Sequence, residues 1–351
     1  MSFIIAEYIW LDANKKLRSK TKIIEFGYHH TADYWSRFSS YPSWDYDGSS
    51  TGQTDDKKSE ITLCPIFVCN NPLIVPLDTF GQNRIAYSKL VLCETYHPDG
   101  TPTPSNKRSS AAAIFESFQE QKPWFGLEQE YFILDKRIET TPHTALFYET
   151  TEHYCGIGHD VEYRTMAEEH MLACIKAGIT ISGINAEVSK NQWEFQIGPS
   201  EGIRASDELL IARFLLERIA EKYGNTISYE PKPFAHINGS GCHANFSTLN
   251  MRTPCKNNEG IAEIYRVLNN LQKHHTEDIQ YYGVSNELRL SGKHETSDYN
   301  TFTYGIGDRG ASARINNNTH RAGYGYFEDR RPAANIDPYL VTSILMKRCA
   351  E

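Results

Sequence analysis

The run of residues 124–134, WFGLEQEYFIL, most constrains how this chain folds, because it places two acids inside a strand-forming apolar segment. Glu128 and Glu130 are two positions apart, so their side chains point to the same face of a strand. The surrounding aromatic and aliphatic residues predict a central, buried strand. Buried like charges repel each other and need a counter-charge, which a divalent cation supplies. The alternative is an edge strand that carries two solvated acids.

A second pair of acids, Glu187 and Glu194, flanks a short connection between two predicted strands. If Lys190 and Asn191 form a two-residue turn, the two glutamates face each other across the hairpin. This register creates another like-charge contact that a cation relieves. A longer connection gives a different register, and the direct pairing then disappears.

A histidine and a further acid later in the chain extend this candidate metal site. His243 lies in a predicted strand, 242–248, and a neutral imidazole is a good ligand for divalent ions, although a lone strand histidine is more often a core residue. Glu328 precedes Asp329 and two arginines, so a salt bridge is its simplest interpretation. Several carboxylates with one histidine favour Mg²⁺ or Mn²⁺ over Zn²⁺, and Mg²⁺ bound in this way usually shares its ligands with phosphates.

Composition and charge predict a soluble globular protein and argue against nucleic acid as its main partner. The chain has 351 residues, a formal net charge of −8 and a pI near 5.9, whereas binding a phosphate backbone needs a basic surface. No secretory signal is visible and no apolar stretch approaches ~18 residues, so we expect a cytoplasmic protein without a membrane span. Its eight cysteines include no Cys-x-x-Cys pair, which is typical of idle thiols in a reducing compartment.

Turn residues divide the chain into two predicted domains. A segment rich in proline and glycine, 97–106, separates a β-rich first part from a second part in which helices and strands alternate. The strands expected in the first part are residues 3–11, 22–26, 73–77 and 90–96. The resulting prediction is an α+β protein with domains 1–98 and 99–351.

The last third of this acidic chain gathers basic residues, namely Arg289, Arg309, Arg314, Arg330 and Arg331. Guanidinium groups bind phosphates and carboxylates, so the set suits an anion clamp, and surface ion pairs are the simpler alternative. The chain contains no GxxxxGK[ST] loop, and the glycine pattern at 305–310 lacks a following helix pattern. A nucleotide site here is therefore of neither the P-loop nor the Rossmann type.

Segments along nearly the whole chain resemble glutamine synthetase of the eukaryotic type, and they occur in that family's order: AEYIW, WDYDGSSTGQ, WFGLEQEYFIL, NAEV followed by QWEFQIGP, NGSGCHANFST, HETS and YFEDRRPAAN. The resemblance implies an ATP-dependent ligase that condenses glutamate with ammonia to give glutamine through a γ-glutamyl phosphate. It implies a small N-terminal β-grasp domain and a larger catalytic α/β domain on a curved antiparallel sheet. It also implies a homo-oligomer of two stacked pentameric rings with active sites between subunits.

The resemblance assigns roles to residues at matching positions. It implies at least two Mg²⁺ or Mn²⁺ ions per site, one held by Glu130, Glu187 and Glu194, the other by Glu128, His243 and Glu328. The implied glutamate-binding residues are Asn238, Gly239, Arg289 and Arg330. The implied nucleotide-binding residues are Trp124, Ser247, Arg309, Arg314 and Tyr326. For catalysis, Asp47 would take a proton from ammonium, Glu295 would close a flap over the site, and Arg309 would hold the transferred phosphoryl group.

A few positions depart from the family's pattern. The chain begins almost at the family's first strand, so the usual N-terminal helical extension is not expected. Asn316 and Asn317 stand where a proline and a basic residue are typical, and Lys293 stands where an apolar residue is more usual. Three other functions compete: a ligase for a larger amine, a relative without catalysis, and a small-molecule kinase. Asp47 and Glu295 favour ammonia as the substrate.

Overall fold

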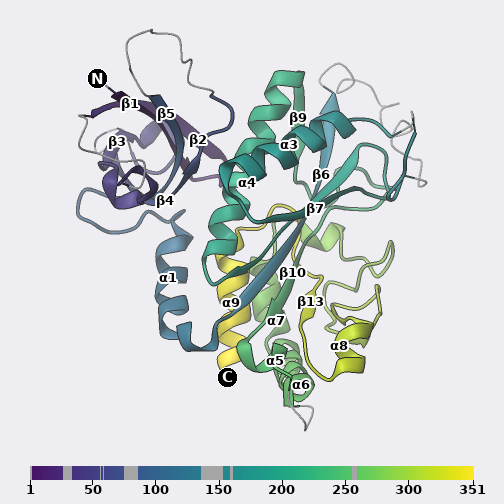
Figure 1. Cartoon of the computed structure of the whole chain (residues 1–351). Helices are drawn as coiled ribbons and strands as arrows, with labels where there is room; N and C mark the ends of the chain where they lie inside the picture. The colour runs from purple at the N-terminus through teal and green to yellow at the C-terminus, as the bar shows by residue number, and fades with distance from the viewer. Residues whose placement is uncertain are drawn as a thin grey trace. The chain divides into compact units, whose positions relative to one another are not determined.

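The computed structural model describes residues 2–26, 34–55, 57, 59–74, 86–135, 153–158, 161–254 and 259–351. Its contacts divide the chain into two compact units, each containing one sheet (Figure 1). The first unit comprises Met1–Ser110, Leu172–Ile179 and Leu210–Leu215, and the second comprises Ala111–Met171, Thr180–Leu209 and Leu216–Glu351. The mixture of sheets and helices confirms the predicted α+β class.

The sheet of the first unit has five strands in the order β2-β1-β5-β4-β3. The strands are β1 (Ser2–Leu11), β2 (Leu17–Phe26), β3 (Trp44–Asp47), β4 (Glu60–Asn70) and β5 (Ala86–Tyr96). β1 and β5 are parallel at the centre, and the other neighbours are antiparallel, in agreement with the predicted β-grasp fold. Alternate residues such as Ile4, Tyr8 and Leu63 are fully buried and form the core of this unit.

The sequence predicted β1, β2 and β5 but missed β3 and β4. β3 is short and carries two acids, Asp45 and Asp47, that a turn would carry equally well. β4 contains Pro65, a residue that argues against a strand, and the structure accommodates it at a shift in register between Pro65 and Phe67. The strand expected at 73–77 lies outside the described residues from position 75 onward.

The sheet of the second unit has the order β11-β12-β13-β10-β6-β8-β7, with β9 also paired to β6. The strands are β6 (Trp124–Asp135), β7 (Ile181–Ala186), β8 (Gln192–Glu201), β9 (Asn225–Ser228), β10 (Cys242–Ser247), β11 (Tyr304–Ile306), β12 (Ala313–Ile315) and β13 (Phe327–Asp329). Neighbours are antiparallel except β11 and β12. β6 lies between β10 and β8 with Phe125 and Leu127 fully buried, so the prediction of a central strand is confirmed and the edge-strand alternative is wrong.

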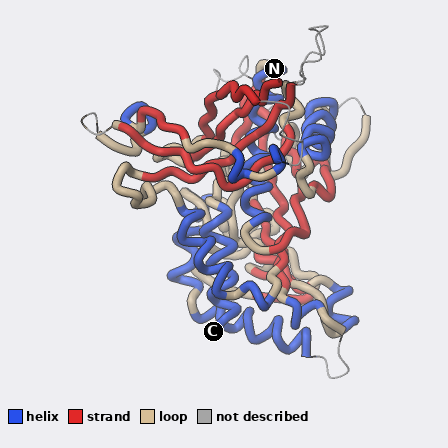
Figure 2. The backbone as a smooth tube through the Cα atoms, turned by 60° about the vertical axis from the view of Figure 1, so that its left-hand side comes forward, coloured by secondary structure: helices blue, strands red, loops and turns tan. Residues whose placement is uncertain are grey.

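The described residues also form helices; Figure 2 shows helices in blue and strands in red. The α-helices are α1 (Lys107–Ser117), α3 (Arg164–Ala177), α4 (Arg204–Tyr223), α5 (Leu249–Arg252), α6 (Glu259–Lys273), α7 (His275–Asp278), α8 (Asn317–Ala322) and α9 (Pro338–Ala350). The short 3₁₀ helices are Tyr34–Ser36, Phe38–Ser40, Ser49–Thr51, Gln119–Gln121, Ile279–Tyr281 and Asn286–Leu288. Within the second unit, the His170 ring of α3 contacts Phe195 of β8, and Tyr339 of α9 donates to Asp207 of α4 at 2.6 Å. Among the described helices, none has the length and apolar character needed to cross a membrane.

Candidate active site

Neighbouring strands of the second sheet bring the predicted acids together. Glu130 of β6 lies directly opposite Glu194 of β8, and Glu128 lies opposite His243 of β10. His243 Nδ1 is 3.6 Å from Glu128 Oε2 and 3.4 Å from Oε1 of Glu328, which comes from β13. One ligand atom from each of these three residues lies within 4.8 Å of the others. The two-residue spacing in β6 therefore places Glu128 and Glu130 at one cavity, as predicted. Strand pairing brings Glu194, His243 and Glu328 close to them.

The predicted register of the β7–β8 hairpin is wrong. Glu194 pairs with Asn185, and the backbone N–H of Glu187 donates to the carbonyl oxygen of Gln192 at 2.9 Å. The connection is longer than the predicted turn, because Gln192 N–H also donates to the carbonyl of Ser189 at 3.1 Å. Glu187 therefore reaches the site from the end of the hairpin rather than from a position opposite Glu194.

A cavity of about 110 Å³ lies among these groups. Its lining combines carboxylates, an imidazole, a phenol, an amide and guanidinium groups, contributed by Glu128, Glu130, Tyr154, Asn185, Glu187, Glu194, His243, Glu295, Arg309, Arg314 and Arg330. Tyr154 and Asn185 were not predicted from the sequence. Neither residue carries a formal charge at neutral pH, so the spacing of charged residues gave no signal for them.

The buried acids in this cavity lack enough counter-charge of their own. Burial, together with the charge of Glu187, raises the pKa of Glu130 to about 8. Burial and the charge of Glu128 raise the pKa of Glu194 well above its usual range, and burial raises the pKa of Glu187. Burial and Arg330 lower the pKa of His243 well below its usual range, so its imidazole is neutral. Repelling carboxylates beside a neutral imidazole are a donor set that fits a divalent cation.

A side-chain amide donates to each of four acids in this cavity. The pairs are Asn245 with Glu128 at 2.7 Å, Gln192 with Glu130 at 3.2 Å, Asn185 with Glu187 at 3.0 Å, and Gln196 with Glu194. Such outer partners orient metal ligands and strengthen binding. Sequence reasoning missed them, although Gln192 and Gln196 alternate with Glu194 along β8, and this two-residue alternation of polar residues in a buried strand was the available signal.

The arginines divide into two groups that the sequence did not distinguish. Arg314 Nε and Arg330 Nη1 lie 2.5 Å and 2.8 Å from Glu328, so the salt bridge considered for Glu328 exists beside the candidate metal site. Arg289 is buried and its Nη2 lies 3.0 Å from His243 Nε2. Arg331 is different: it is fully buried and pairs with Asp329 at 2.6 Å, away from the cavity lining. Including Arg331 in the predicted anion clamp was therefore wrong, because adjacent residues of an extended segment point in opposite directions.

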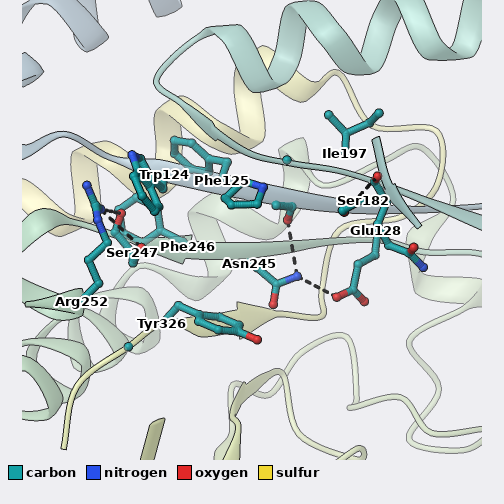
Figure 3. Close-up of a pocket in the computed structure, with 15 residues that line it drawn as sticks. Trp124, Phe125, Glu128, Ser182, Ile197, Asn245, Phe246, Ser247, Arg252 and Tyr326 are labelled. Carbon is teal, nitrogen blue, oxygen red and sulfur yellow. Dashed lines mark hydrogen bonds between the residues drawn. The ribbon is translucent and has the colours of Figure 1, made fainter. Parts of the chain in front are cut away.

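A larger pocket of about 440 Å³ is also present in the second unit. Trp124, Ser247 and Tyr326 line it, together with Arg252, which sequence reasoning missed. Figure 3 shows Trp124, Ser247 and Arg252 grouped at one end and Glu128 at the other. The Arg252 guanidinium lies 4.0 Å from the centre of the Trp124 ring and donates to the Ser247 carbonyl at 3.2 Å. An aromatic wall with a few polar groups is typical of a pocket that binds a planar ligand.

The predicted flap residue contacts an arginine of the cavity. Glu295 pairs with Arg309 at 3.2 Å, and both side chains are about half exposed. Backbone φ angles of +54° at His294 and +58° at Glu295 place two consecutive non-glycine residues in the left-handed region. Such strain is a feature of switch segments and ligand clamps.

The predicted glutamate-binding segment, Asn238 and Gly239, lies in the loop before β10. A Cβ atom on Gly239 would overlap the carbonyl oxygen of Pro231, so this close approach requires glycine. The backbone N–H of Gly241, farther along the loop, donates to Glu130 Oε2 at 2.8 Å. A hydrogen bond therefore links this loop directly to the carboxylate cluster, which we define as Glu128, Glu130, Glu187 and Glu194.

Asp47 belongs to the first unit, whereas the other predicted site residues belong to the second. It ends β3, and its carboxylate accepts from the Ser49 hydroxyl at 2.7 Å and from the Ser50 hydroxyl at 2.6 Å. These hydrogen bonds lower the pKa of Asp47, so this exposed carboxylate stays ionised at neutral pH.

Buried carboxylates with a neutral imidazole, next to arginines and an aromatic pocket, are typical of metal-dependent enzymes that act on phosphate compounds. The family model "Glutamine synthetase, catalytic domain" matches residues 106–349. Over 350 residues, the chain is 44% identical to glutamine synthetase N-1 of Phaseolus vulgaris, covering 97% of this chain and 92% of that protein. It is 43% identical to a glutamine synthetase cytosolic isozyme of Pinus sylvestris with the same coverage, and 44% identical to glutamine synthetase of Kluyveromyces lactis, covering 97% and 87%. The chain belongs to the glutamine synthetase family.

The buried acids predict that the metal-free protein loses stability as pH rises. Between the ordinary value of 4.5 and about 8, folded Glu130 keeps a proton that the unfolded chain has released. The free energy of unfolding should therefore fall with a contribution of about 1.4 kcal/mol per pH unit from this group. Thermal unfolding from pH 5.5 to 8 in EDTA measures this slope, and saturating Mn²⁺ should flatten it. Metal-free protein that is most stable at pH 8 would contradict the prediction.

Proposed function

We propose that this ATP-dependent glutamate–ammonia ligase forms glutamine through a γ-glutamyl phosphate, at the cavity lined in part by residues of β6, β7, β8, β10 and β12. Membership of the glutamine synthetase family gives the overall reaction. The observation that carries the proposed site is Glu128, which lines both the pocket of about 440 Å³ and the cavity of about 110 Å³. A nucleotide that occupies the larger pocket would therefore have carboxylates and arginines close to its phosphates.

The candidate ligands fit two divalent cations, Mg²⁺ or Mn²⁺. One set would be Glu130, Glu187 and Glu194, and the other Glu128, His243 and Glu328. When bound, such cations neutralise phosphate charge and polarise the phosphoryl group that is transferred. The raised pKa values of Glu130 and Glu194 support this assignment, because each of these acids needs a cation to remain ionised where it lies.

Arginine side chains would offset the negative charge that the metal ions do not neutralise. A carboxylate is a poor electrophile, so its oxygen must first accept the γ-phosphoryl group of ATP. Arg309, Arg314 and Arg330 line the cavity and would offset charge that develops during this transfer. Arg289, with Asn238 and Gly239, would hold glutamate by charge-assisted hydrogen bonds.

A planar base would bind in the larger pocket. Trp124, Ser247 and Tyr326 line this pocket and are the proposed nucleotide contacts. Arg309 and Arg314 line the smaller cavity instead, where the phosphates would lie. This division assigns the aromatic residues to the base and the arginines to the phosphates.

After ammonium loses a proton, ammonia would attack the acyl carbon of the γ-glutamyl phosphate. A C–N bond would form, the C–O bond to the phosphoryl group would break, and inorganic phosphate would leave. Asp47 is the proposed acceptor, because an ionised, exposed carboxylate both attracts ammonium and can take its proton. Glu295 would close the site against water, which would otherwise hydrolyse the intermediate.

Three broader features complete the proposal: domains 1–98 and 99–351, a homo-oligomer of two stacked pentameric rings with active sites between subunits, and a cytoplasmic location. The family resemblance supports the first two. Relatives in Pinus sylvestris, Glycine max and Oryza sativa that are named cytosolic isozymes support the third. The molar mass of the purified protein in solution tests the assembly.

The reaction itself is tested by product analysis. Protein supplied with glutamate, ATP, Mg²⁺ and ammonium should release phosphate and glutamine in equal amounts, and both should stop without Mg²⁺ or ammonium. Phosphate release that does not need ammonium would support a kinase instead. A product formed only when a polyamine replaces ammonium would support a ligase for larger amines.

A further inference from the structure

Gln192 touches both the carboxylate cluster and the glutamate-binding loop. It begins β8 and its side chain is 1% exposed. Its Nε2 atom donates to Glu130 Oε2 at 3.2 Å and to the Gly239 carbonyl oxygen at 2.9 Å, with the Ser240 hydroxyl at 3.3 Å. One buried amide nitrogen therefore bridges a proposed metal ligand and the proposed glutamate segment.

The orientation of this amide is set by its surroundings. A flipped amide would place Oε1 against a carboxylate and a carbonyl oxygen, which are both acceptors, and lose both hydrogen bonds. Gln192 Oε1 itself is buried and has no hydrogen-bond partner among the described residues. The hydrogen bonds that Nε2 donates are therefore the ones that hold this amide group. Its position depends on the contacts with Glu130 and Gly239.

The same contacts decide how Glu130 faces the cavity. Glu130 Oε2 accepts from Gln192 and also from the backbone N–H of Gly241 at 2.8 Å. The other oxygen, Oε1, lies 4.0 Å from His243 Nε2. Hydrogen bonds to Oε2 thus hold the Glu130 carboxylate in place, and Oε1 is the atom that faces His243.

We infer that Gln192 is a positioning residue that couples glutamate binding at Gly239 to cation binding at Glu130. This inference rests on the proposed function of the two sites. A substrate that orders the Gly239 loop strengthens the Gln192 bridge and so fixes the Glu130 carboxylate for the cation. By linkage, a bound cation must improve glutamate binding by the same factor. Removing the Gln192 side chain should abolish the coupling between glutamate and the cation without removing the binding site of either.

Gln129 provides a matched control. It is also a fully buried glutamine in the same sheet, and its Nε2 donates to the backbone carbonyls of Glu130 and Ala334 at 2.8 Å and 3.1 Å. Both of these hydrogen bonds end on backbone carbonyl oxygens rather than on the Glu130 carboxylate. Gln129→Met and Gln192→Met therefore remove the same kind of side chain from the same core, but only the second removes the proposed bridge.

The test measures Mn²⁺ binding by electron paramagnetic resonance, with and without glutamate, and without ATP or turnover. In the wild type, saturating glutamate should strengthen Mn²⁺ binding at least about fivefold. Gln192→Met should reduce this factor to below about twofold and weaken Mn²⁺ binding about tenfold. Gln129→Met should keep the wild-type coupling factor.

A second variant protects the test against misfolding. Gln192→Asn keeps a polar amide but is shorter by one methylene, so it should also lose the coupling while thermal unfolding reports that it is folded. Coupling that survives in either folded Gln192 variant, or that is absent from the wild type, would overturn the inference and leave the proposed metal site intact. Wild-type protein that binds no Mn²⁺ would overturn the proposed function and this inference together.

Discussion

Glu194→Gln is expected to make the metal-free protein more stable while removing most of its glutamine synthesis. Glu194 is 8% exposed and lies directly opposite Glu130. Burial disfavours its ionised form most, and the charges of Glu128 and Glu130 add to this effect. A neutral amide of the same shape has no charge to bury or to repel, so the free energy of unfolding at pH 8 in EDTA should rise by at least about 1 kcal/mol. The same change removes a proposed metal ligand. Removing a residue that only hydrogen-bonds a metal ligand typically lowers metal affinity or activity about 10- to 100-fold. Removing the ligand itself should therefore lower kcat by more than about 100-fold.

Three measurements on one variant separate these effects: urea unfolding in EDTA, Mn²⁺ titration and glutamine formation. The control is Glu221→Gln on α4, where an exposed acid pairs with Arg218 at 3.1 Å. That surface change should alter stability by less than about 0.5 kcal/mol and leave Mn²⁺ binding as it is. A Glu194→Gln protein that binds Mn²⁺ as tightly as the wild type would remove Glu194 from the proposed ligand set.

Asp47→Asn is expected to leave ATP binding unchanged and to reduce glutamine formation by about 10²- to 10⁴-fold, the range for loss of a general base. The amide keeps the size of the side chain but carries no charge. Its oxygen can still accept from one of the two serine hydroxyls, Ser49 or Ser50, while its NH2 group can donate to the other. It therefore neither attracts ammonium nor takes its proton. The loss should persist at saturating ammonium, because proton transfer is impaired as well as binding.

Asp45→Asn is the matched control for this change. Asp45 is exposed on the same strand, β3, two positions before Asp47, and accepts from the Thr62 hydroxyl at 3.2 Å. Its replacement should not change ATP binding or glutamine formation. ATP binding is measured by calorimetry and glutamine by a coupled assay. Undiminished turnover in Asp47→Asn, or an equal loss in both variants, would refute the proposed role of Asp47.

The features predicted correctly from the sequence are those that depend on near neighbours in the chain. Glu128 and Glu130 share one face because side chains alternate along any strand. The buried character of β6 follows from the apolar residues around these acids, and the structure confirms it. The family and its reaction were also recognisable, because the ordered motifs occupy nearly the whole chain, and the match over 106–349 confirms this.

The errors concern relations that local sequence does not contain. The β7–β8 register depends on the length of the connection between the two strands. This connection is longer than a two-residue turn, and within it the backbone N–H of Gln192 donates to the carbonyl oxygen of Ser189. Arg331 carries the same charge as Arg330, yet it turns into the core to pair with Asp329. Pro65 made β4 unrecognisable because a bulge compensates for a residue that normally interrupts a strand.

The sequence by itself determined the chemistry that is available: the family, the acids on one face of β6, and the need for a counter-charge among them. Only the tertiary structure decided which groups meet, because Glu130 and Glu194, or Gln192 and Gly239, become neighbours through strand pairing and loop closure. Those contacts depend on the free energy of the whole packed sheet rather than on any single segment. For that reason the acidic residues could be identified from the sequence, whereas the amide side chains that orient their carboxylates could not.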